Sequence, residues 1–400
     1  MKRHRFRPET EAVRGGDHLE KRNAALAQPI YQTSTFQVTD SDEQLRATST
    51  DMFYTRYGNP THTAVERALA ELEGTDAALL FASGMGAITT AVLALVKNGE
   101  HIVAQRDVYG GVTKFLSTWL VQLGIETTFV DTTEYDQHVS AIRPNTRLLY
   151  LESPTNPTLR VVDLAETVAI ARDHDLITLI DSTFATPINQ RPAEFGIDIV
   201  VHSGTKYLAG HTDLICGAVC GRRDLIDRIR ETRTTLGGVM DPHAAFLLRR
   251  GMKTLALRVA RQNQTALQIA EHLAHHRKVR AVNYPFLEAH PQRALALKQM
   301  TGGGGVLSFE IDGTGEDARR LSESLHLFSL APSLGGVESL VSIPVLTSHA
   351  MISPEHRQKM GVSEQLIRLS VGIENADDLL ADLDQALAVV TRSQQQVAVG

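Results

Sequence analysis

Short apolar runs alternate with longer amphipathic stretches through the middle of the chain. The runs AALLFA, EHIVAQ, ETTFVD, RLLYLES, LITLID and DIVVHS are typical of short buried strands. The stretches between them, such as residues 61–74, 84–99, 112–124 and 162–175, repeat apolar positions at helical spacing, and Gly74 is a helix C-cap signal. This alternation predicts an α/β fold with a mostly parallel, doubly wound sheet.

The pattern changes near both ends of the chain. After about Arg250 we expect a long helix over 252–276, a glycine loop at 302–305 before the strand VLSFEI, a further helix, and a final strand and helix. The first 60 residues are irregular, which is typical of a tail or of an arm that packs on another subunit. We therefore predict an N-terminal arm at 1–60, a large domain at 61–255 and a smaller C-terminal α/β domain at 256–400.

Composition excludes several classes of partner. The 400 residues are 42% hydrophobic and 22% charged with a net charge of −6, so no basic surface for nucleic acid and no membrane segment is expected. The basic start MKRHRFRPET has no apolar run behind it, so no signal peptide is expected. Cys216 and Cys220 are the only cysteines. They fit small core residues of a cytoplasmic protein, and no metal site is predicted because zinc would need more ligands.

Polar residues follow several predicted strands. Residues 83–86 (SGMG) open a helix after AALLFA, where glycines let backbone N–H groups approach a phosphate, although a tight strand–helix turn would look the same. Tyr109 stands beside Gly110 and Gly111 after EHIVAQ. It can stack on a planar ring or transfer protons, or it can simply flank a turn.

The later strands end in an amide, a carboxylate and an amine. Asn156 lies between two prolines, which either form a rigid turn or orient its side-chain amide toward a ligand. Asp181 follows an apolar strand, so it either needs a cationic partner where it is buried or caps a helix. Lys206 follows Ser203 and Thr205, and is either a solvated charge or a reactive amine. Pyridoxal 5′-phosphate (PLP) needs this whole set: a phosphate cradle, an aromatic ring, a lysine for its aldehyde and a carboxylate for its ring nitrogen.

At this point the sequence resembles a known family nearly from end to end. It is similar to the Cys/Met-metabolism (trans-sulfuration) PLP enzymes, such as cystathionine γ-synthase, cystathionine γ-lyase and methionine γ-lyase. The motifs are YTRYGNPT at 54–61, FASGMGAI at 81–88, DVYGG at 107–111, ESPTNP at 152–157, IDST at 180–183, VHSGTKYLAGH at 201–211, SLGGVESL at 333–340 and LIRLSVGIEN at 366–375. The resemblance implies a fold-type I PLP enzyme that acts on a small amino acid.

The resemblance also implies a role for each matching residue. Lys206 would carry the internal aldimine with the cofactor, Asp181 would pair with the ring nitrogen, and Tyr109 would stack on the ring and act as acid or base. Asn156 would bind the phenolic oxygen. The remaining cofactor-binding residues implied are Tyr54, Arg56, Gly84, Met85, Thr183, Ser203 and Thr205. Arg368 would bind the substrate α-carboxylate, assisted by Ser333, with Tyr54 and Asn156 also lining the substrate site.

In this family the tyrosine and arginine of the Tyr-x-Arg pair reach the phosphate of the neighbouring subunit. Here they are Tyr54 and Arg56, so the resemblance implies a homotetramer built from active-site dimers. The implied reaction is γ-elimination or γ-replacement on a sulfur-containing or homoserine-derived L-amino acid. Methionine γ-lyases typically carry cysteine where this chain has Gly111, and SLGD where it has SLGG. Both differences favour the cystathionine enzymes, whereas Phe53 and SGMGAIT favour methionine γ-lyase, which stays the alternative together with a specialised γ-lyase.

Overall fold

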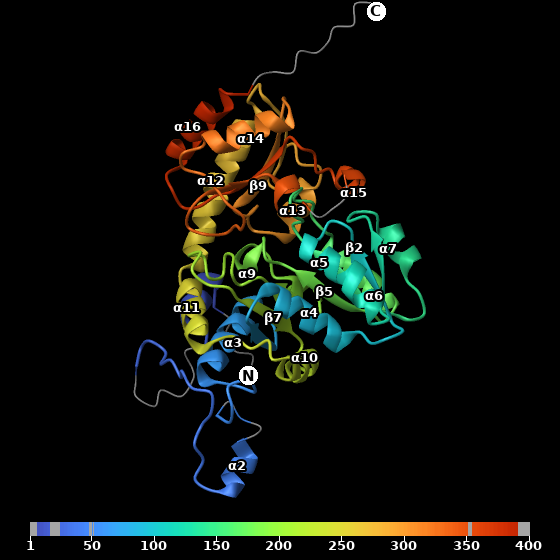
Figure 1. The fold of residues 1–400 in the computed structure, drawn as a ribbon, viewed down its shortest axis with the longest axis vertical. Helices are drawn as coiled ribbons and strands as arrows, with labels where there is room; N and C mark the ends of the chain where they lie inside the picture. Colours follow the sequence, from blue (N-terminus) through green and yellow to red (C-terminus); the bar gives the residue numbers. More distant parts are fainter. Residues whose placement is uncertain (1–5, 17–24, 48–49, 51, 351–353, 391–400) are drawn as a thin grey trace, which may run out of the picture. The chain divides into compact units, whose positions relative to one another are not determined.

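The computed structural model describes residues 6–16, 25–47, 50, 52–350 and 354–390, which form two compact units (Figure 1). The first unit comprises the described residues within 1–106, 111–152 and 162–257, and the second those within 107–110, 153–161 and 258–400. The basic start at 1–5 and parts of the predicted arm, at 17–24, 48–49 and 51, lie outside the described residues. The domain boundaries at 60/61 and 255/256 stay predictions.

The first unit is built on a seven-stranded sheet in the order β1-β7-β6-β5-β4-β2-β3. Its strands are β1 (Ala77–Phe81), β2 (His101–Gln105), β3 (Glu126–Val130), β4 (Thr146–Glu152), β5 (Ile177–Asp181), β6 (Ile199–His202) and β7 (Gly217–Gly221). The pairings among β2, β3, β4, β5 and β6 are parallel, which confirms the predicted mostly parallel sheet. Only β7 among these strands runs antiparallel, to both β1 and β6.

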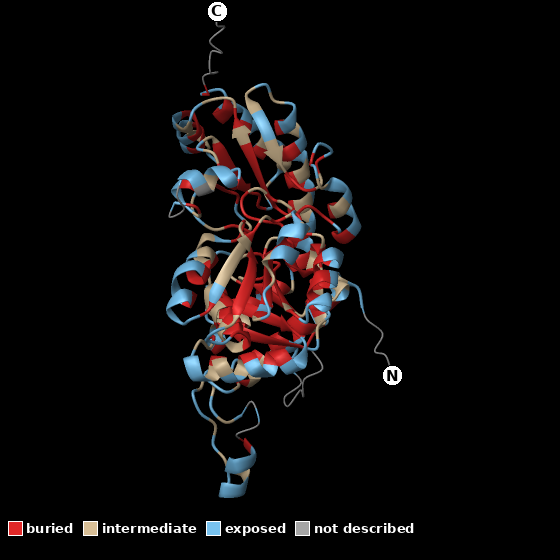
Figure 2. Cartoon of the chain, turned by 90° about the vertical axis from the view of Figure 1, so that its right-hand side faces the viewer, coloured by how far each residue is buried: buried red, intermediate tan, exposed pale blue. Residues whose placement is uncertain are grey.

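Apart from β3 at its edge, the strands of this sheet are largely buried (Figure 2). The first unit also contains helices and short helical turns. They are α1 (Pro8–Arg14), α2 (Ser41–Ala47), α3 (Pro60–Glu73), α4 (Gly84–Leu95), α5 (Gly110–Lys114), a π-helix (Phe115–Trp119), α6 (Leu120–Gln122), α7 (Tyr135–Ala141), α8 (Leu164–Asp173), α9 (Thr186–Asn189), a 3₁₀ turn (Pro192–Phe195), α10 (Arg223–Leu236) and α11 (Pro242–Met252). The predicted C-cap is confirmed, because Gly74 ends α3 in the left-handed conformation with φ of 74°. Helices α1 and α2 are regular elements within the segment expected to be irregular.

The second unit contains a five-stranded sheet in the order β10-β11-β12-β9-β8. Its strands are β8 (Val279–Asn283), β9 (Val306–Ile311), β10 (Ser329–Leu330), β11 (Leu340–Ser342) and β12 (Leu366–Ser370). Its helices are α12 (Leu255–Ala274), α13 (Arg293–Gln299), α14 (Gly315–Ser324), a 3₁₀ turn (Pro344–Leu346), α15 (Pro354–Lys359) and α16 (Ala376–Leu387). The predicted helix over 252–276 is α12, and the glycines at 302–305 form the predicted loop before β9.

The core of the second unit lies between its sheet and its helices. Leu307 and Phe309 of β9, Ile367 and Leu369 of β12, and Leu383 of α16 are all fully buried in one cluster. The alternating residue of β12, Arg368, faces away from these apolar neighbours because side chains alternate along a strand. Within the described part of the chain, no helix has the length and apolar character required to cross a membrane.

Candidate active site

The carboxyl ends of β5 and β6 bring three of the predicted residues together in the first unit. Asp181 ends β5 and pairs in register with Val201 of β6. The hydroxyl of Thr183 accepts a hydrogen bond from the backbone N–H of Ser203 (2.9 Å), and the Asp181 carboxylate accepts one from the backbone N–H of Thr183 (2.9 Å). The strand ends are therefore joined by hydrogen bonds where open α/β sheets bind ligands.

The turn between β1 and α4 packs against the same place. Ser83 caps α4, its hydroxyl accepting a hydrogen bond from the backbone N–H of Gly86 at 3.0 Å. A Cβ atom placed on Gly84 would lie 2.8 Å from the Cβ of Ser203, so only glycine fits at this position without movement. The N-terminal N–H groups of α4 thus lie next to Ser203, an arrangement suited to a phosphate. Met85, in the first turn of α4, is half-buried.

Asp181 lies in an electrostatically demanding position, with 8% of its surface exposed. Burial raises the pKa of its carboxyl, while hydrogen bonds from Thr183 and the charges of His202 and Lys206 act in the opposite direction. Burial, with help from Asp181 and Glu152, also raises the pKa of Tyr150 on β4. A cationic partner would relieve the cost of ionising Asp181 here.

Lys206 lies in the turn that follows β6, half-buried, with its backbone N–H donating to Ser203 O at 3.1 Å. Its neighbour Thr205 donates its hydroxyl proton to Cys216 O (3.1 Å) and accepts from Cys216 N–H (2.9 Å). Thr205 thereby ties the Lys206 turn to the start of β7. To bind a phosphate oxygen as predicted, its hydroxyl would have to give up the bond to Cys216 O. Both cysteines are buried and free, and burial raises the pKa of each thiol well above its usual value.

Tyr54 and Arg56 lie together elsewhere on the first unit, beside an open pocket of about 460 Å³. The Arg56 guanidinium donates to Thr234 O (2.9 Å) and lies 5.5 Å from the centre of the Tyr54 ring. Tyr54 is 40% exposed. That the pair serves another subunit stays a prediction.

The second unit holds the predicted carboxylate-binding group. Arg368, 5% exposed, lies on β12 between β11 and β9. Its guanidinium donates to the side-chain oxygen of Asn156 and to the backbone oxygen of Ser333, both at 3.0 Å. Ser333 adopts a φ of 94°, a left-handed conformation that is costly for serine. Asn156, Ser333 and Arg368 therefore form one connected group, although they are far apart in the sequence.

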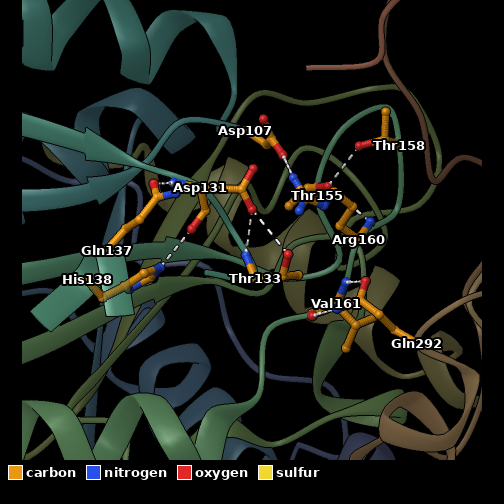
Figure 3. A network of polar contacts seen from close by, with 10 residues as sticks. All are labelled: Asp107, Asp131, Thr133, Gln137, His138, Thr155, Thr158, Arg160, Val161 and Gln292. Atoms are coloured by element: carbon orange, nitrogen blue, oxygen red, sulfur yellow. Dashed lines mark hydrogen bonds and ion pairs between the residues drawn. The ribbon is translucent and has the colours of Figure 1, made fainter. Parts of the chain in front are cut away.

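Tyr109, 44% exposed, is held on a turn that also belongs to the second unit. Two residues before it, the nearly buried carboxylate of Asp107 accepts a hydrogen bond from Arg160 at 2.8 Å (Figure 3). The backbone N–H of Arg160 donates to the hydroxyl of Thr155, the neighbour of Asn156. Arg160 thus links the turn of Tyr109 to the loop of Asn156.

A histidine lies close to the same group. His349 is fully buried, and its Nδ1 is 2.8 Å from the hydroxyl of Ser348, whose backbone oxygen approaches Gly110 closely enough to exclude a side chain there. Burial, followed by the charges of Arg368 and Arg357, lowers the pKa of His349 to about 4. His349 is therefore neutral at physiological pH.

Two of the polar contacts that the sequence did not predict lie near the predicted site residues. One is the ion pair Asp107–Arg160, and the other is the contact between His202 and Glu73 at the end of α3. His202 stands directly before Ser203 in the motif around Lys206, at the end of a predicted buried strand. The sequence could therefore have indicated that this histidine needs a polar partner. The identity of the partner could not be predicted, because Glu73 is one of several acidic residues on an amphipathic helix and the sequence does not distinguish it from the others.

The geometry agrees with the comparisons to known proteins. The family model described as "Cys/Met metabolism PLP-dependent enzyme" matches residues 9–388. L-methionine gamma-lyase of Porphyromonas gingivalis is 44% identical over 385 residues, covering 94% of this chain and 96% of the relative. Cystathionine beta-lyase of Lactococcus lactis subsp. cremoris is 42% identical, covering 94% and 98%. The crystal structure of cystathionine gamma-lyase from Lactobacillus plantarum complexed with L-serine has a TM-score of 0.91 at 39% identity, covering 96% and 99%.

The fold and site define a PLP-dependent enzyme of fold-type I. The chain belongs to the family of Cys/Met-metabolism PLP-dependent enzymes, which confirms the resemblance, the fold class, the enzyme class and the cofactor predicted from the sequence.

The first unit fits the cofactor chemically. The cradle at Gly84 leaves no room for a side chain against Ser203, and the buried carboxylate of Asp181 calls for a cationic partner such as a protonated ring nitrogen. The roles of the individual residues remain proposals.

Proposed function

We propose that this enzyme catalyses γ-elimination or γ-replacement on a sulfur-containing or homoserine-derived L-amino acid, with cystathionine-type substrates ahead of methionine. The observation that carries the proposal is the Arg368 group. Its planar guanidinium is buried and oriented by Asn156 and Ser333. Arginine in such a site suits bidentate recognition of an amino acid's α-carboxylate.

When bound, PLP links covalently to an amine and withdraws electrons from the carbon that carries it. Asp181 would hold the proton of the ring nitrogen, and Gly84, Met85 and Ser203 would bind the phosphate. Arg368 would bind the substrate carboxylate, and the free amine of Lys206 would accept the proton from Cα. A second proton would be removed from Cβ, and Tyr109 would then donate a proton to the leaving group as the C–S or C–O bond at Cγ breaks.

The choice of substrate rests on two glycines. Gly111 stands where methionine γ-lyases typically carry cysteine, and Gly336 stands where they carry aspartate. Without the cysteine side chain, the pocket near the leaving group fits methionine less specifically. A pocket contact of one or two methylene groups changes kcat/KM by roughly 10- to 200-fold. Methionine γ-lyase remains the second candidate, supported by the similarity to the P. gingivalis enzyme.

A substrate panel tests this proposal. Methionine, cystathionine, O-acetylhomoserine and O-phosphohomoserine are each supplied with and without cysteine, and products are identified by mass. We expect cystathionine or an activated homoserine ester to exceed methionine by at least about tenfold in kcat/KM, and Gly111→Cys to narrow that gap. Cystathionine cleaved at Cγ yields 2-oxobutyrate and cysteine. Pyruvate and homocysteine would instead indicate β-cleavage and contradict the proposal, as would a wild-type preference for methionine.

We also infer that the enzyme is a homotetramer of active-site dimers and that it is cytoplasmic. Tyr54 and Arg56 are both exposed on the first unit, where a neighbouring subunit could be reached, and this supports a shared site. The two buried free thiols, Cys216 and Cys220, suit a reducing compartment. Sedimentation of the purified enzyme tests the tetramer, and a dimer or monomer at micromolar concentration would contradict it.

A further inference from the structure

One buried serine of the second unit contacts the loop that carries Asn156. Ser308 lies in the middle of β9, in the mostly apolar run VLSFEI, and it is fully buried. Leu307 and Phe309 on either side of it belong to the apolar core of the unit, so the Ser308 side chain lies on the opposite face of the sheet. A hydroxyl buried in this way destabilises the fold unless it is hydrogen-bonded. The bonds that Ser308 makes therefore indicate why a serine stands here.

Two hydrogen bonds connect Ser308 to its neighbours, and the groups involved determine their directions. The hydroxyl of Ser308 donates to the backbone oxygen of Pro157 at 2.7 Å. The side-chain amide of Asn283 on β8, the register partner of Ser308, donates to the same hydroxyl at 3.0 Å. Because the carbonyl oxygen of Pro157 can only accept, it takes the single proton of the hydroxyl, and Asn283 must present its NH2 group. Asn283 therefore keeps the Ser308 proton directed toward Pro157.

Arg368 contacts the preceding residue of the same loop from the neighbouring strand. It is the register partner of Ser308, so the two side chains lie on the same face of the sheet. Its guanidinium donates to the side-chain oxygen of Asn156 at 3.0 Å. Two paired strand residues thus hold two consecutive residues of the loop, Asn156 and Pro157. Because arginine only donates, Asn156 turns its carbonyl oxygen toward Arg368 and its NH2 group away from it.

We propose that Ser308 is a positioning residue for the binding of the substrate's α-carboxylate. Oriented by Asn283, it holds the segment Asn156–Pro157 in place, and this segment in turn orients the guanidinium of Arg368. Without the hydroxyl, the backbone oxygen of Pro157 loses its donor and the segment loses one of its two attachments to the sheet. The inference rests on the proposed function in one respect, the binding of the carboxylate by Arg368.

The test measures how strongly the holoenzyme prefers a ligand that has a carboxylate. Dissociation constants are determined for L-alanine and for ethylamine, which differ by the carboxylate alone, from the change in the cofactor's visible absorption. Neither ligand has a leaving group, so neither is consumed by elimination. General damage to the site weakens both ligands alike, so the ratio of the two constants reports carboxylate binding.

Threonine and valine at position 308 give a matched comparison, because both are β-branched and of similar shape but only threonine has a hydroxyl. We expect the preference for L-alanine to be lower in Ser308→Val than in Ser308→Thr by roughly three- to tenfold, the range that one hydrogen bond contributes. Any effect of the added methyl group is common to both variants. Only variants with a native circular dichroism spectrum are compared, and Ser308→Ala against the wild type replaces the pair should either not fold.

Ser322→Ala controls for the loss of a buried serine as such. Ser322 on α14 is also buried in the second unit, and its hydroxyl donates to the backbone oxygen of Ala318 at 2.8 Å. Its replacement removes a similar hydrogen bond at a position not connected to Asn156. We expect this variant to keep the wild-type preference, and a loss as large as that of Ser308→Val would contradict a specific role of Ser308.

Asn283→Asp tests the direction of the hydrogen bonds. Aspartate has nearly the same shape as asparagine, but its carboxylate can only accept and therefore competes with Pro157 for the Ser308 proton. We expect this variant to lower the preference for L-alanine, as Ser308→Val does. A wild-type preference in Asn283→Asp, or equal preferences in Ser308→Thr and Ser308→Val, would overturn the inference.

Arg368→Leu separates this inference from the proposed function. If it abolishes the preference for L-alanine while Ser308→Val keeps it, the inference is wrong and the proposed role of Arg368 stands. If Arg368→Leu itself keeps the wild-type preference, carboxylate binding by Arg368 is wrong, and the inference falls with it.

Discussion

The close approach of Gly84 to Ser203 gives a prediction with a measurable size. A methyl group added by Gly84→Ala would lie 2.8 Å from the Cβ and 3.0 Å from the Cα of Ser203, whereas carbon atoms prefer about 3.5–4.0 Å. Rotating the serine side chain cannot relieve either contact. The backbone of one segment must therefore move by roughly half an ångström or more.

Ser203 resists that movement because it is tied on both sides. Its N–H donates to Thr183, and its carbonyl oxygen accepts from the N–H of Lys206. We expect Gly84→Ala to lower the free energy of unfolding of the apoenzyme by about 1–3 kcal/mol, the usual cost of overpacking. Because the shift reaches the turn of Lys206, the dissociation constant for PLP should rise by at least about tenfold, equivalent to about 1.4 kcal/mol.

Gly86→Ala is the control, two residues further along the same helix. The nearest atom to its new methyl group is the Ser83 hydroxyl oxygen at 3.1 Å, on a side chain and not on a backbone carbon. Alanine is better than glycine inside a helix by about 0.5–1 kcal/mol, which offsets this contact. Urea unfolding followed by circular dichroism and PLP titration give both quantities. A Gly84→Ala protein as stable as Gly86→Ala, with wild-type affinity for PLP, would refute the packing argument.

Three further predictions concern other parts of the enzyme. Asp107→Asn and Arg160→Ala should each weaken PLP binding, and a double-mutant cycle should give a coupling of about 1 kcal/mol or more; additive effects would show that this pair does not position the turn of Tyr109. Mixing inactive Arg56→Ala and Lys206→Ala proteins should restore part of the activity through hybrid dimers with one intact site, and no recovery after verified subunit exchange would contradict the shared site. Burial lowers the pKa of His349 to about 4 in the folded protein, whereas a histidine in the unfolded chain has a pKa near 6.5. Between pH 4 and 6.5 the unfolded chain therefore binds a proton that the folded protein does not. The free energy of unfolding is therefore highest above pH 6.5 and decreases by at most about 3 kcal/mol as the pH falls toward 4. His349→Asn should make the free energy of unfolding, measured by urea denaturation, depend less on pH over that range. An unchanged pH dependence in this variant would exclude the contribution of His349.

The sequence predicted the elements that carry the site because their patterns are local. Each predicted strand of the large sheet was found, and β5 and β6 are adjacent and parallel, in agreement with the predicted mostly parallel sheet. The antiparallel direction of β7 was not predicted, although the signal was present. No crossover helix separates the end of β6 at His202 from the start of β7 at Gly217, and a parallel neighbour requires such a crossover.

Local irregularities were harder to predict. The amphipathic stretch at 112–124 was expected to be one helix, but a π-helical segment, Phe115–Trp119, divides α5 from α6. Periodicity at 3.6 residues cannot distinguish one such turn from an α-helix, because the apolar positions fit both within the length of a few residues. In the arm, α1 and α2 are only seven residues long, below the length at which a repeat is recognisable.

The residues proposed to contact substrate or cofactor and the residues that pack behind them differ in how they can be found in the sequence. A group such as Lys206 or Asp181 must lie at a strand end, and a strand end is visible in the sequence as a polar residue after an apolar run. A side chain that packs behind the strand end needs only to be close in space, so Glu73, the hydrogen-bond partner of His202, lies 129 residues away in the sequence. Nothing in the pattern of α3 distinguishes Glu73, which is buried against His202, from Glu71, which lies two positions earlier and is only half-buried. The partner of a buried side chain such as His202 is therefore determined by how the helix packs on the sheet, which a short sequence motif does not specify.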